Sequence, residues 1–501
     1  MLERELDIPL YQQLADEIGQ DIQSGVYLPG HKVPSLRKMS ERKGVSISTV
    51  SQSYAWLEDQ GCLIARPQSG YYVRPVMHSD QAPASLTPSE PPSEVTKAAL
   101  INSLLQQLNI KGFINLGASV PEPSLLPQRQ LQQHIQKVSR FHISEVLDYQ
   151  FSPGHPGLRQ QLAIRMRDVQ VGCQADDIVM THGCAEALTL CLRATTQPGD
   201  LVAVESPCYY GFLQLAANMG LKILEIPTDP STGISTAALE LALQQWPVKL
   251  VALTARFSNP TGALMPIQNQ RRVVELARQY DVGILEDDIY GEIFYSADIR
   301  SSQASTAEQA GMRSVLKAFD TDERVMYCSS FSKTLSAGLR VGWCLPARWR
   351  KQVVEQQTFT TFSASSLSQH TVHSYLQSGS FDRHLRRLRK QMGETQQQFV
   401  EAIRRYFPQD IRINLPLGGY CLWIELPEGV KASQLYYLAR EEFISISPGG
   451  LFSNSQRFDG HVRINISRLW NPQIEQALAA LGRLVKGLVQ GSMQGLSSAV
   501  E

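Results

Sequence analysis

The sequence lacks any long apolar segment and any basic amino terminus that leads into one. No uninterrupted apolar run approaches the roughly 18 residues that a membrane-spanning helix needs, so contact with a membrane is not expected. The chain starts Met1-Leu2-Glu3-Arg4-Glu5, with acidic side chains where a secretory signal carries basic ones. We therefore expect a chain that is not exported and that works in the cytoplasm.

Cysteines arranged for metal binding are lacking as well. None of the eight forms a CxxC pair or has a histidine at zinc-ligand spacing, so no metal is expected. Because they are scattered among apolar neighbours, we interpret them as reduced thiols of the core, as in a reducing compartment. They are Cys62, Cys173, Cys184, Cys191, Cys208, Cys328, Cys344 and Cys421.

A net charge is also lacking, because 47 Lys and Arg residues balance 47 Asp and Glu residues. No global field therefore attracts nucleic acid, and any contact with DNA must come from a local basic surface. Hydrophobic residues make up 43% of the chain and charged residues 19%, which is the composition of folded globular domains.

The chain divides into two parts around a linker. Its 501 residues predict two to four domains. Residues 76–97 are rich in Pro, Ser and Ala and show no helical or strand periodicity, as is typical of a linker. This segment separates a unit at residues 1–75 from a long unit at residues 98–490, and residues 491–501 are expected to form a flexible tail.

The first unit has the pattern of a winged helix-turn-helix. Apolar residues recur every four positions from Leu10 to Ile22, which predicts a helix. Ser35 and Ser46 can cap two further helices, and Gly44 separates them. Two strand-like runs joined by a tight turn close the unit: Cys62–Ile64, residues 67–70 and Tyr71–Val73.

The second unit alternates short apolar runs with helical patterns, as a mostly parallel sheet requires. Ligands of an open α/β sheet bind beyond the carboxyl ends of the strands, so the residues that follow these runs are candidate site residues. The predicted strands are Ile178–Met180, Leu201–Glu205, Lys222–Ile226, Lys249–Thr254, Gly283–Glu286, Val325–Ser329 and Val341–Leu345.

One of these runs leads into a lysine, two hydroxyls and an arginine. Lys333 can condense with an aldehyde. Ser330, Ser332 and Arg340 can hold a phosphate, Arg340 with two parallel hydrogen bonds. For an isolated Ser-x-Lys, a surface lysine in a polar loop is the ordinary alternative.

Four further strand ends supply matching groups. Asp287 can keep a pyridine nitrogen protonated, so that the ring withdraws electrons. Tyr290 and Asn259 can bond a ring hydroxyl, and Tyr209 can stack on the ring face. Loop amides at the first strand end open a helix and can bind the phosphate: those of Gly183, Cys184 and Ala185.

Each of these residues has a structural alternative when it is taken alone, since a strand-end Asp often caps a helix and an Asn-Pro turn needs no ligand. Together, however, five strand ends each supply one part of a single cofactor site. On these motifs residues 98–490 resemble the class I aminotransferases of fold type I. The resemblance implies an α/β domain with a smaller carboxyl-terminal α+β subdomain, mainly over residues 370–490. It also implies pyridoxal 5'-phosphate held as a Schiff base on the catalytic Lys333.

The same resemblance implies a homodimer with each site at the subunit interface. It assigns Tyr149 to the partner's cofactor phosphate, Arg463 to the α-carboxylate of a substrate and Gly117 to the substrate-side loop. From the sequence alone, an exposed strand arginine explains Arg463 equally well.

Residues 8–74 resemble the GntR-type winged helix. In this family the helix that starts near Ser46 enters the major groove. Ile47 stands where arginine is usual and Ser51 where charge is frequent, so either Ile47 touches a thymine methyl or DNA binding is weak. A helix-turn-helix that makes only protein contacts is the alternative. Local positive charge comes from Lys32, Arg37, Lys38, Arg42 and Lys43. The candidate DNA-binding residues are Lys32, Ser35, Arg37, Ser46, Ile47, Ser48, Thr49 and Gly70.

The order of a GntR-type domain, a linker and an aminotransferase-like domain resembles the MocR/GabR group of regulators. It implies a transcriptional regulator that depends on pyridoxal phosphate, binds double-stranded DNA as a head-to-tail homodimer and senses the cofactor or a small amino compound. A working aminotransferase that carries a DNA-binding module is the alternative. A third interpretation makes the large domain a scaffold without cofactor.

Overall fold

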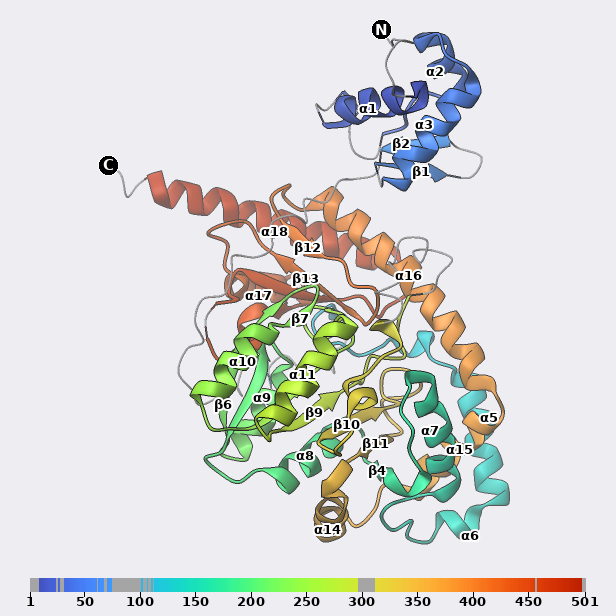
Figure 1. Ribbon diagram of the computed structural model, residues 1–501, viewed down its shortest axis with the longest axis vertical. Helices are drawn as coiled ribbons and strands as arrows, with labels where there is room; N and C mark the ends of the chain where they lie inside the picture. The colour runs from blue at the N-terminus through green and yellow to red at the C-terminus, as the bar shows by residue number, and fades with distance from the viewer. Residues whose placement is uncertain are drawn as a thin grey trace. The chain divides into compact units, whose positions relative to one another are not determined.

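The chain divides into two compact units, Met1–Gln81 and Ala82–Glu501 (Figure 1). The computed structural model describes residues 9–23, 26–27, 31–60, 62–66, 70–73, 101, 106, 110, 112–295, 311–455 and 457–497. The predicted linker at residues 76–97 and the predicted turn residues 67–69 lie outside the described residues.

The described part of the first unit contains three helices and an antiparallel hairpin, as the sequence predicts. The Oγ of Ser35 accepts a hydrogen bond from the amide of Lys38, and the Oγ of Ser46 accepts one from the amide of Thr49. Gly44 ends the second helix with a left-handed φ of 65°. The elements are α1 (Leu10–Gln23), α2 (Leu36–Lys43), α3 (Ile47–Asp59), β1 (Leu63–Arg66) and β2 (Gly70–Val73).

A large sheet organises the second unit in the strand order β4-β11-β10-β9-β8-β5-β6-β7. The neighbours from β10 to β6 run parallel, whereas β11 lies antiparallel between β10 and β4. The predicted, mostly parallel sheet is therefore confirmed. Its strands are β4 (Val179–Thr181), β5 (Leu201–Ser206), β6 (Lys222–Asp229), β7 (Gly233–Ile234), β8 (Val248–Leu253), β9 (Gly283–Asp287), β10 (Val325–Ser330) and β11 (Gly342–Leu345).

Helices cover both faces of this sheet (Figure 1). Val202 and Val204 pack with residues of α8, whereas Leu201 and Ala203 pack with residues of α10 and α11. With both faces buried, the strand interiors are apolar and the polar groups concentrate at the strand ends. The helices are α5 (Gln128–Phe141), α6 (Ile143–Val146), α7 (Pro156–Met166), α8 (Cys184–Thr195), α9 (Tyr210–Asn218), α10 (Thr236–Gln245), α11 (Ile267–Gln279), α14 (Arg350–Thr360) and α15 (Ser366–Gln377).

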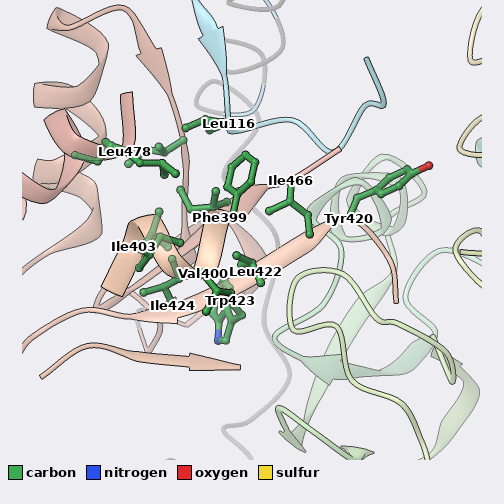
Figure 2. Close-up of a cluster of buried hydrophobic side chains, with 14 of the residues drawn as sticks. Leu116, Phe399, Val400, Ile403, Tyr420, Leu422, Trp423, Ile424, Ile466 and Leu478 are labelled. Carbon is green, nitrogen blue, oxygen red and sulfur yellow. The ribbon is translucent and has the colours of Figure 1, made fainter. Parts of the chain in front are cut away.

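A second, antiparallel sheet in the order β12-β13-β16-β15 forms the smaller subdomain. Figure 2 shows Phe399 and Ile403 of α16 and Leu478 of α18 among its apolar side chains, with Leu422 and Ile424 of β13. The elements are β12 (Arg412–Asn414), β13 (Cys421–Glu425), β15 (Ser447–Pro448), β16 (His461–Asn465), α16 (Ser380–Tyr406), α17 (Ala432–Glu441) and α18 (Pro472–Ser497).

A segment far from residues 370–490 in the sequence joins this subdomain. The two-residue strand β3 (Ile114–Asn115) pairs in parallel with β14 (Ile444–Ser445). Two residues show no periodicity, so the sequence does not predict this pairing. The segment that follows β3 enters the cavity described below.

Helix α18 continues to Ser497, so residues 491–497, which the sequence predicts as part of a flexible tail, are helical. Gly487 and Gly491 favour an earlier end, but the apolar face formed by Leu484 and Leu488 packs on the core and extends the helix. No helix among the described residues combines the length and apolar character needed to cross a membrane.

All eight cysteines are free, and all except Cys62 and Cys173 are buried. Their environment agrees with the interpretation as core thiols.

Candidate cofactor site and nucleic-acid interface

The carboxyl ends of β4, β5, β8, β9 and β10 lead to one cavity of about 390 Å³. Most of the residues that the sequence singles out line this cavity, although they are far apart along the chain. Those that line it are Cys184, Ala185, Tyr209, Asn259, Asp287, Tyr290, Ser332, Lys333, Arg340 and Arg463.

Lys333 lies just beyond the end of β10, in the wall of this cavity. Its Nζ donates a hydrogen bond to the carbonyl of Ser119 at 2.5 Å, and its own carbonyl accepts one from the hydroxyl of Tyr420 at 2.7 Å. Burial lowers the pKa of the amine to about 8, because the charged form loses its hydration. A substantial fraction of the amine is therefore neutral near physiological pH and can attack an aldehyde.

Asp287 ends β9 at the same cavity. Its Oδ1 accepts from the amide of Ile289 at 3.2 Å, and the thiol of Cys184 lies 3.4 Å away. Burial raises the pKa of the carboxyl to about 6. The group is thus mainly ionised at neutral pH and can pair with a cationic ring nitrogen.

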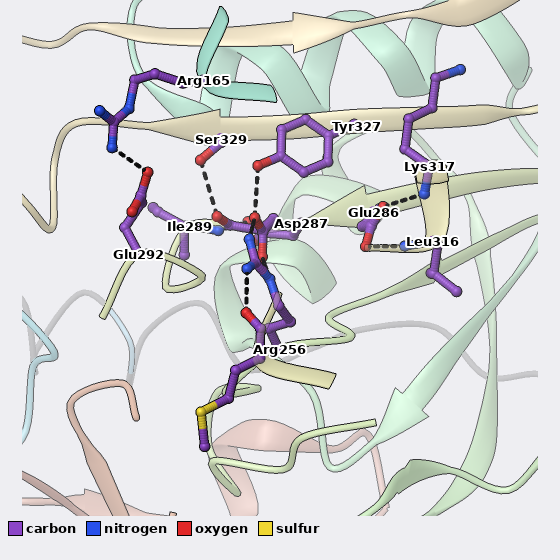
Figure 3. Close-up of polar contacts among 12 residues, drawn as sticks. Arg165, Arg256, Glu286, Asp287, Ile289, Glu292, Leu316, Lys317, Tyr327 and Ser329 are labelled. Carbon is purple, nitrogen blue, oxygen red and sulfur yellow. Dashed lines mark hydrogen bonds and ion pairs between the residues drawn. The ribbon is translucent and has the colours of Figure 1, made fainter. Parts of the chain in front are cut away.

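A buried ion pair lies next to Asp287. Figure 3 shows Arg256 and Tyr327 converging beside it. The Nε of Arg256 donates to Asp288 at 2.9 Å, and the hydroxyl of Tyr327 donates to the same carboxylate at 2.6 Å. The guanidinium neutralises Asp288, which would otherwise repel the neighbouring carboxylate.

One end of the cavity has the features of an anion site. Helix α8 begins at Cys184, and the preceding Gly183 provides no side-chain cap for the first-turn amides. Arg340 reaches this end, where its guanidinium donates to the carbonyl of His182 at 2.9 Å and lies 3.4 Å from the Oγ of Ser332. A Cβ on Gly183 would lie 2.5 Å from Arg340 Nη2 and would displace this guanidinium, and the φ of +81° also favours glycine. His182 itself bonds the carbonyl of Ser363.

Arg463 is fully buried, which rules out an exposed strand arginine. It lies on β16, and its Nη1 donates to Asn259 Oδ1 at 2.7 Å. Its Nη2 donates to the carbonyl of Gly117 and to the Oγ of Ser447. Among the described residues, none accepts a hydrogen bond from its Nε. The guanidinium is therefore positioned from two sides and keeps capacity for one more acceptor.

Tyr290 and Tyr209 line different parts of the cavity. The hydroxyl of Tyr290 donates to the Oγ of Ser119 at 2.9 Å. Tyr209 precedes α9 and is 38% exposed, so part of its ring remains open to the cavity. Ser119 and Tyr420, which contact Lys333, could not be predicted from the sequence, because neither belongs to a strand-end motif.

Three predicted cofactor residues do not line this cavity. Gly183 lies next to it, directly before the lining residue Cys184. Ser330 lines a smaller neighbouring cavity, and its Oγ accepts from the amide of Ser332 at 3.2 Å. Tyr149 is 68% exposed and stacks on Phe151, with ring centroids 5.3 Å apart. Gly117 does not line the cavity either, but its carbonyl accepts a hydrogen bond from Arg463, which does.

The first unit presents a polar helix start next to exposed basic side chains. Ser46, Ser48 and Thr49 are linked by hydrogen bonds at the start of α3, and Ile47 is 47% exposed beside them. Gln52 is exposed one turn later. An amide at this position can read adenine, although the helix-turn-helix motif in the sequence does not single out Gln52.

The basic side chains of this unit differ in their partners. Lys32 and Arg37 are exposed, and Lys32 packs near Gly70, which has a φ of +100°. Lys43 pairs with Glu17, and Arg42 bonds the hydroxyl of Tyr27. Arg37, which follows the Ser35 cap at the start of α2, is therefore the better candidate for a phosphate contact.

Known proteins match both units. Residues 10–73 match the family of bacterial regulatory proteins, gntR family, and residues 111–481 match the family of aminotransferases, class I and II. YdcR of Escherichia coli K12, named as an uncharacterized HTH-type transcriptional regulator, is 38% identical over 477 residues. These residues cover 95% of this chain and 99% of YdcR.

Solved structures agree with the match of the second unit. A kynurenine aminotransferase of Pyrococcus horikoshii superposes with a TM-score of 0.70 at 26% identity, over 78% of this chain and 95% of the other. LysN, an α-aminoadipate aminotransferase of Thermus thermophilus in complex with N-(5'-phosphopyridoxyl)-L-leucine, superposes with a TM-score of 0.69 at 28% identity. The match covers 79% of this chain and 96% of LysN. The chain therefore belongs to the class I and II aminotransferase family, in the MocR/GabR-type arrangement with an amino-terminal gntR-family domain.

Proposed function

We propose that this chain is a DNA-binding transcriptional regulator that depends on pyridoxal 5'-phosphate. The observation that carries the proposal is the union, in one chain, of a gntR-family domain with a cavity built around a buried lysine. Its similarity to YdcR over 99% of that relative supports the regulatory role. Such a protein acts on double-stranded DNA in the cytoplasm.

The residues of the cavity fit pyridoxal phosphate at each of its polar groups. Lys333 supplies the amine for the aldehyde, and Asp287 can pair with the ring nitrogen. Arg340, Ser332 and the amides that open α8 can hold the phosphate. The glycine at position 183 keeps this end open, since a Cβ there would meet Arg340.

The remaining groups fit the ring and an amino compound. Asn259 and Tyr290 can bond the ring hydroxyl, and Tyr209 can stack on the ring face. When bound, pyridoxal phosphate supplies an electron-poor ring that stabilises negative charge at the Cα of an amino compound. Arg463, beside the carbonyl of Gly117, can bind a carboxylate through its unused donor capacity.

We further propose that the chain acts as a head-to-tail homodimer. Tyr149, Phe151 and Phe362 form an exposed aromatic group, which we call the aromatic patch. Exposed apolar clusters of this kind commonly mark association surfaces. In the dimer, Tyr149 would reach the cofactor phosphate of the partner.

Regulation requires that the ligand distinguish two states of the protein. Cofactor or an amino compound can change DNA binding only if its affinity differs between the DNA-competent state and the other state. Binding in the large cavity would then alter how the two winged helices meet their DNA.

The proposal is tested by binding of the full chain to DNA fragments from beside its own gene, measured by fluorescence anisotropy against scrambled fragments. We expect saturable binding that is at least about a thousandfold tighter on one native fragment, as is typical of specific regulators. Equal affinity for native and scrambled fragments would contradict the proposal.

A working aminotransferase is the second candidate, and the lowered pKa of Lys333 favours it. A partly neutral amine at this position can carry a proton to and from the Cα of a substrate. Incubation of the pure chain with amino acids and a keto acid tests this. Many turnovers per cofactor, without specific DNA binding, would establish the enzyme instead of the regulator.

A further inference from the structure

A cluster of histidines lies outside the cofactor cavity, where α5, α6 and α15 contact one another (Figure 1). His142 lies between α5 and α6, Glu145 lies on α6 and His370 lies on α15. One ligand atom from each of these three residues lies within 4.8 Å of the other two. The function proposed above uses none of them.

The separations suit a small metal ion. Two ligand atoms bound at about 2.1 Å to a tetrahedral ion lie about 3.4 Å apart. The Nδ1 of His142 is 3.0 Å from Glu145 Oε1, and the Nδ1 of His370 is 3.8 Å from Glu145 Oε2. These two distances, which involve the two different oxygens of Glu145, lie on either side of the value expected around a bound ion. The third separation joins a ring nitrogen of His142 to one of His370 and is at most 4.8 Å. The side chain of His142 is partly exposed and can rotate to shorten this separation.

The ring of His370 has unused binding capacity. Its side chain is only 5% exposed, and its buried Nε2 has no hydrogen-bond partner among the described residues. The Nδ1 of the same ring lies toward Glu145 and is the nitrogen that would bind an ion there.

We propose that His142, Glu145 and His370 bind a divalent transition-metal ion of the zinc type. Two imidazoles and one carboxylate are ligands that this class of ion prefers, and a water molecule completes a tetrahedron. The spacing in the sequence does not predict the site, because His370 is distant from the other two ligands.

The bound ion would join α6 to α15. At present Ser366 of α15 donates a hydrogen bond to the carbonyl of Asp148 at 2.9 Å, close to the aromatic patch. A metal bridge would add a stronger link to the segment that leads to Tyr149. The site itself does not depend on the proposed function.

The alternative is an ordinary ion pair between His142 and Glu145 at the surface, with His370 as a packed core residue. Titration of Zn²⁺ into the full, metal-free chain without a polyhistidine tag separates the two. We expect one ion per chain by calorimetry. We also expect Co²⁺ to give the intense visible bands of a tetrahedral nitrogen and oxygen site.

Glu145→Gln and His370→Gln should each weaken Zn²⁺ binding at least about tenfold. Glu145 is exposed, so its variant keeps the fold even if the buried His370 variant does not. His134→Gln is the matched control, because His134 also joins α5 to α15, through Ser374, but lies outside the cluster. It should bind like wild type.

The proposal is overturned if the wild-type chain shows no saturable binding. It is overturned as well if Glu145→Gln binds Zn²⁺ as tightly as wild type, since the ion would then lie elsewhere, for example on the partly exposed Cys62 or Cys173.

Discussion

At the residue scale, the chemistry of Lys333 depends on the side chains around it. Burial brings the pKa of its amine from 10.5 to about 8, and Ser119 and Tyr420 fix its position. Asp287 and Arg340 lie in the same cavity wall and can pair with opposite ends of one cofactor. A lysine in a polar surface loop would have none of these features.

The lowered pKa of Lys333 predicts that the rate of cofactor attachment increases with pH. The neutral amine is the nucleophile, so its fraction in the apoprotein rises as pH increases and levels off above about 8. We expect the initial rate of covalent cofactor attachment, followed by visible absorbance, to do the same.

The reaction of the cofactor with N-α-acetyl-lysine corrects for the titration of the cofactor itself. A rate that continues to rise up to about pH 10, as for an exposed lysine, would show that the amine is not buried as described.

Gly183 provides a second test. In Gly183→Ala the new Cβ would crowd Arg340, and the alanine would have to adopt a φ near +81°. We therefore expect the affinity for pyridoxal phosphate to fall at least about tenfold. Gly199→Ala is the matched control, because Gly199 has a similar φ of +93° but open space around it.

Gly199→Ala should lower the melting temperature without changing cofactor affinity. If both variants bound cofactor like wild type, the assignment of an anion site to the start of α8 would be wrong. Equilibrium dialysis of the apoproteins measures the affinity.

The strand-end residues could be predicted because parallel strands bring their carboxyl ends to one edge of a sheet. Asp287, Asn259 and Lys333 follow from this rule. Ser119 and Tyr420 do not, because they come from the segment after β3 and from the smaller subdomain, which no periodicity places at the cavity. The burial of Arg463 likewise depends on the packing of that subdomain.

At the element scale, capping residues and apolar periodicity predicted most helices and strands. Ser35 and Ser46 cap α2 and α3 as expected, and the seven predicted strands are present. The pairing of β3 with β14 and the continuation of α18 could not be predicted. Both depend on packing between segments that are distant in the sequence.

A substitution on helix α2 tests the proposed nucleic-acid interface. We expect Arg37→Ala to weaken binding to native and scrambled DNA alike and to reduce the slope of log affinity against log salt by about 1, because one phosphate contact is lost. Fluorescence anisotropy at several salt concentrations measures both effects.

Lys43→Ala is the control, since Lys43 already pairs with Glu17 and has less to offer a phosphate. It should change the slope less than Arg37→Ala. The reverse order would mean that a different face of the unit meets DNA.

At the scale of the whole molecule, the chain combines two compact units, Met1–Gln81 and Ala82–Glu501. The aromatic patch is exposed on the second unit and includes Tyr149, the residue that the proposed dimer would use. Association would bury these side chains and bring Tyr149 to the partner.

We expect the wild-type chain to sediment as a dimer and Phe151→Asp to shift it toward monomer, because a buried carboxylate would be unpaired at the interface. Leu241→Asp, which changes an apolar residue of α10 that is 52% exposed, should remain dimeric. A monomeric wild type, or equal dissociation of both variants, would contradict the proposed surface.

In the proposed function, pyridoxal phosphate on Lys333 controls DNA binding. This control is measured as the dissociation constant for the specific DNA fragment, with the apoprotein, the cofactor-loaded protein and Lys333→Ala with cofactor added. A coupling of ordinary size predicts at least about a fivefold difference between the first two. It also predicts that added cofactor has no effect on Lys333→Ala. Equal dissociation constants for apoprotein and cofactor-loaded protein would contradict this claim.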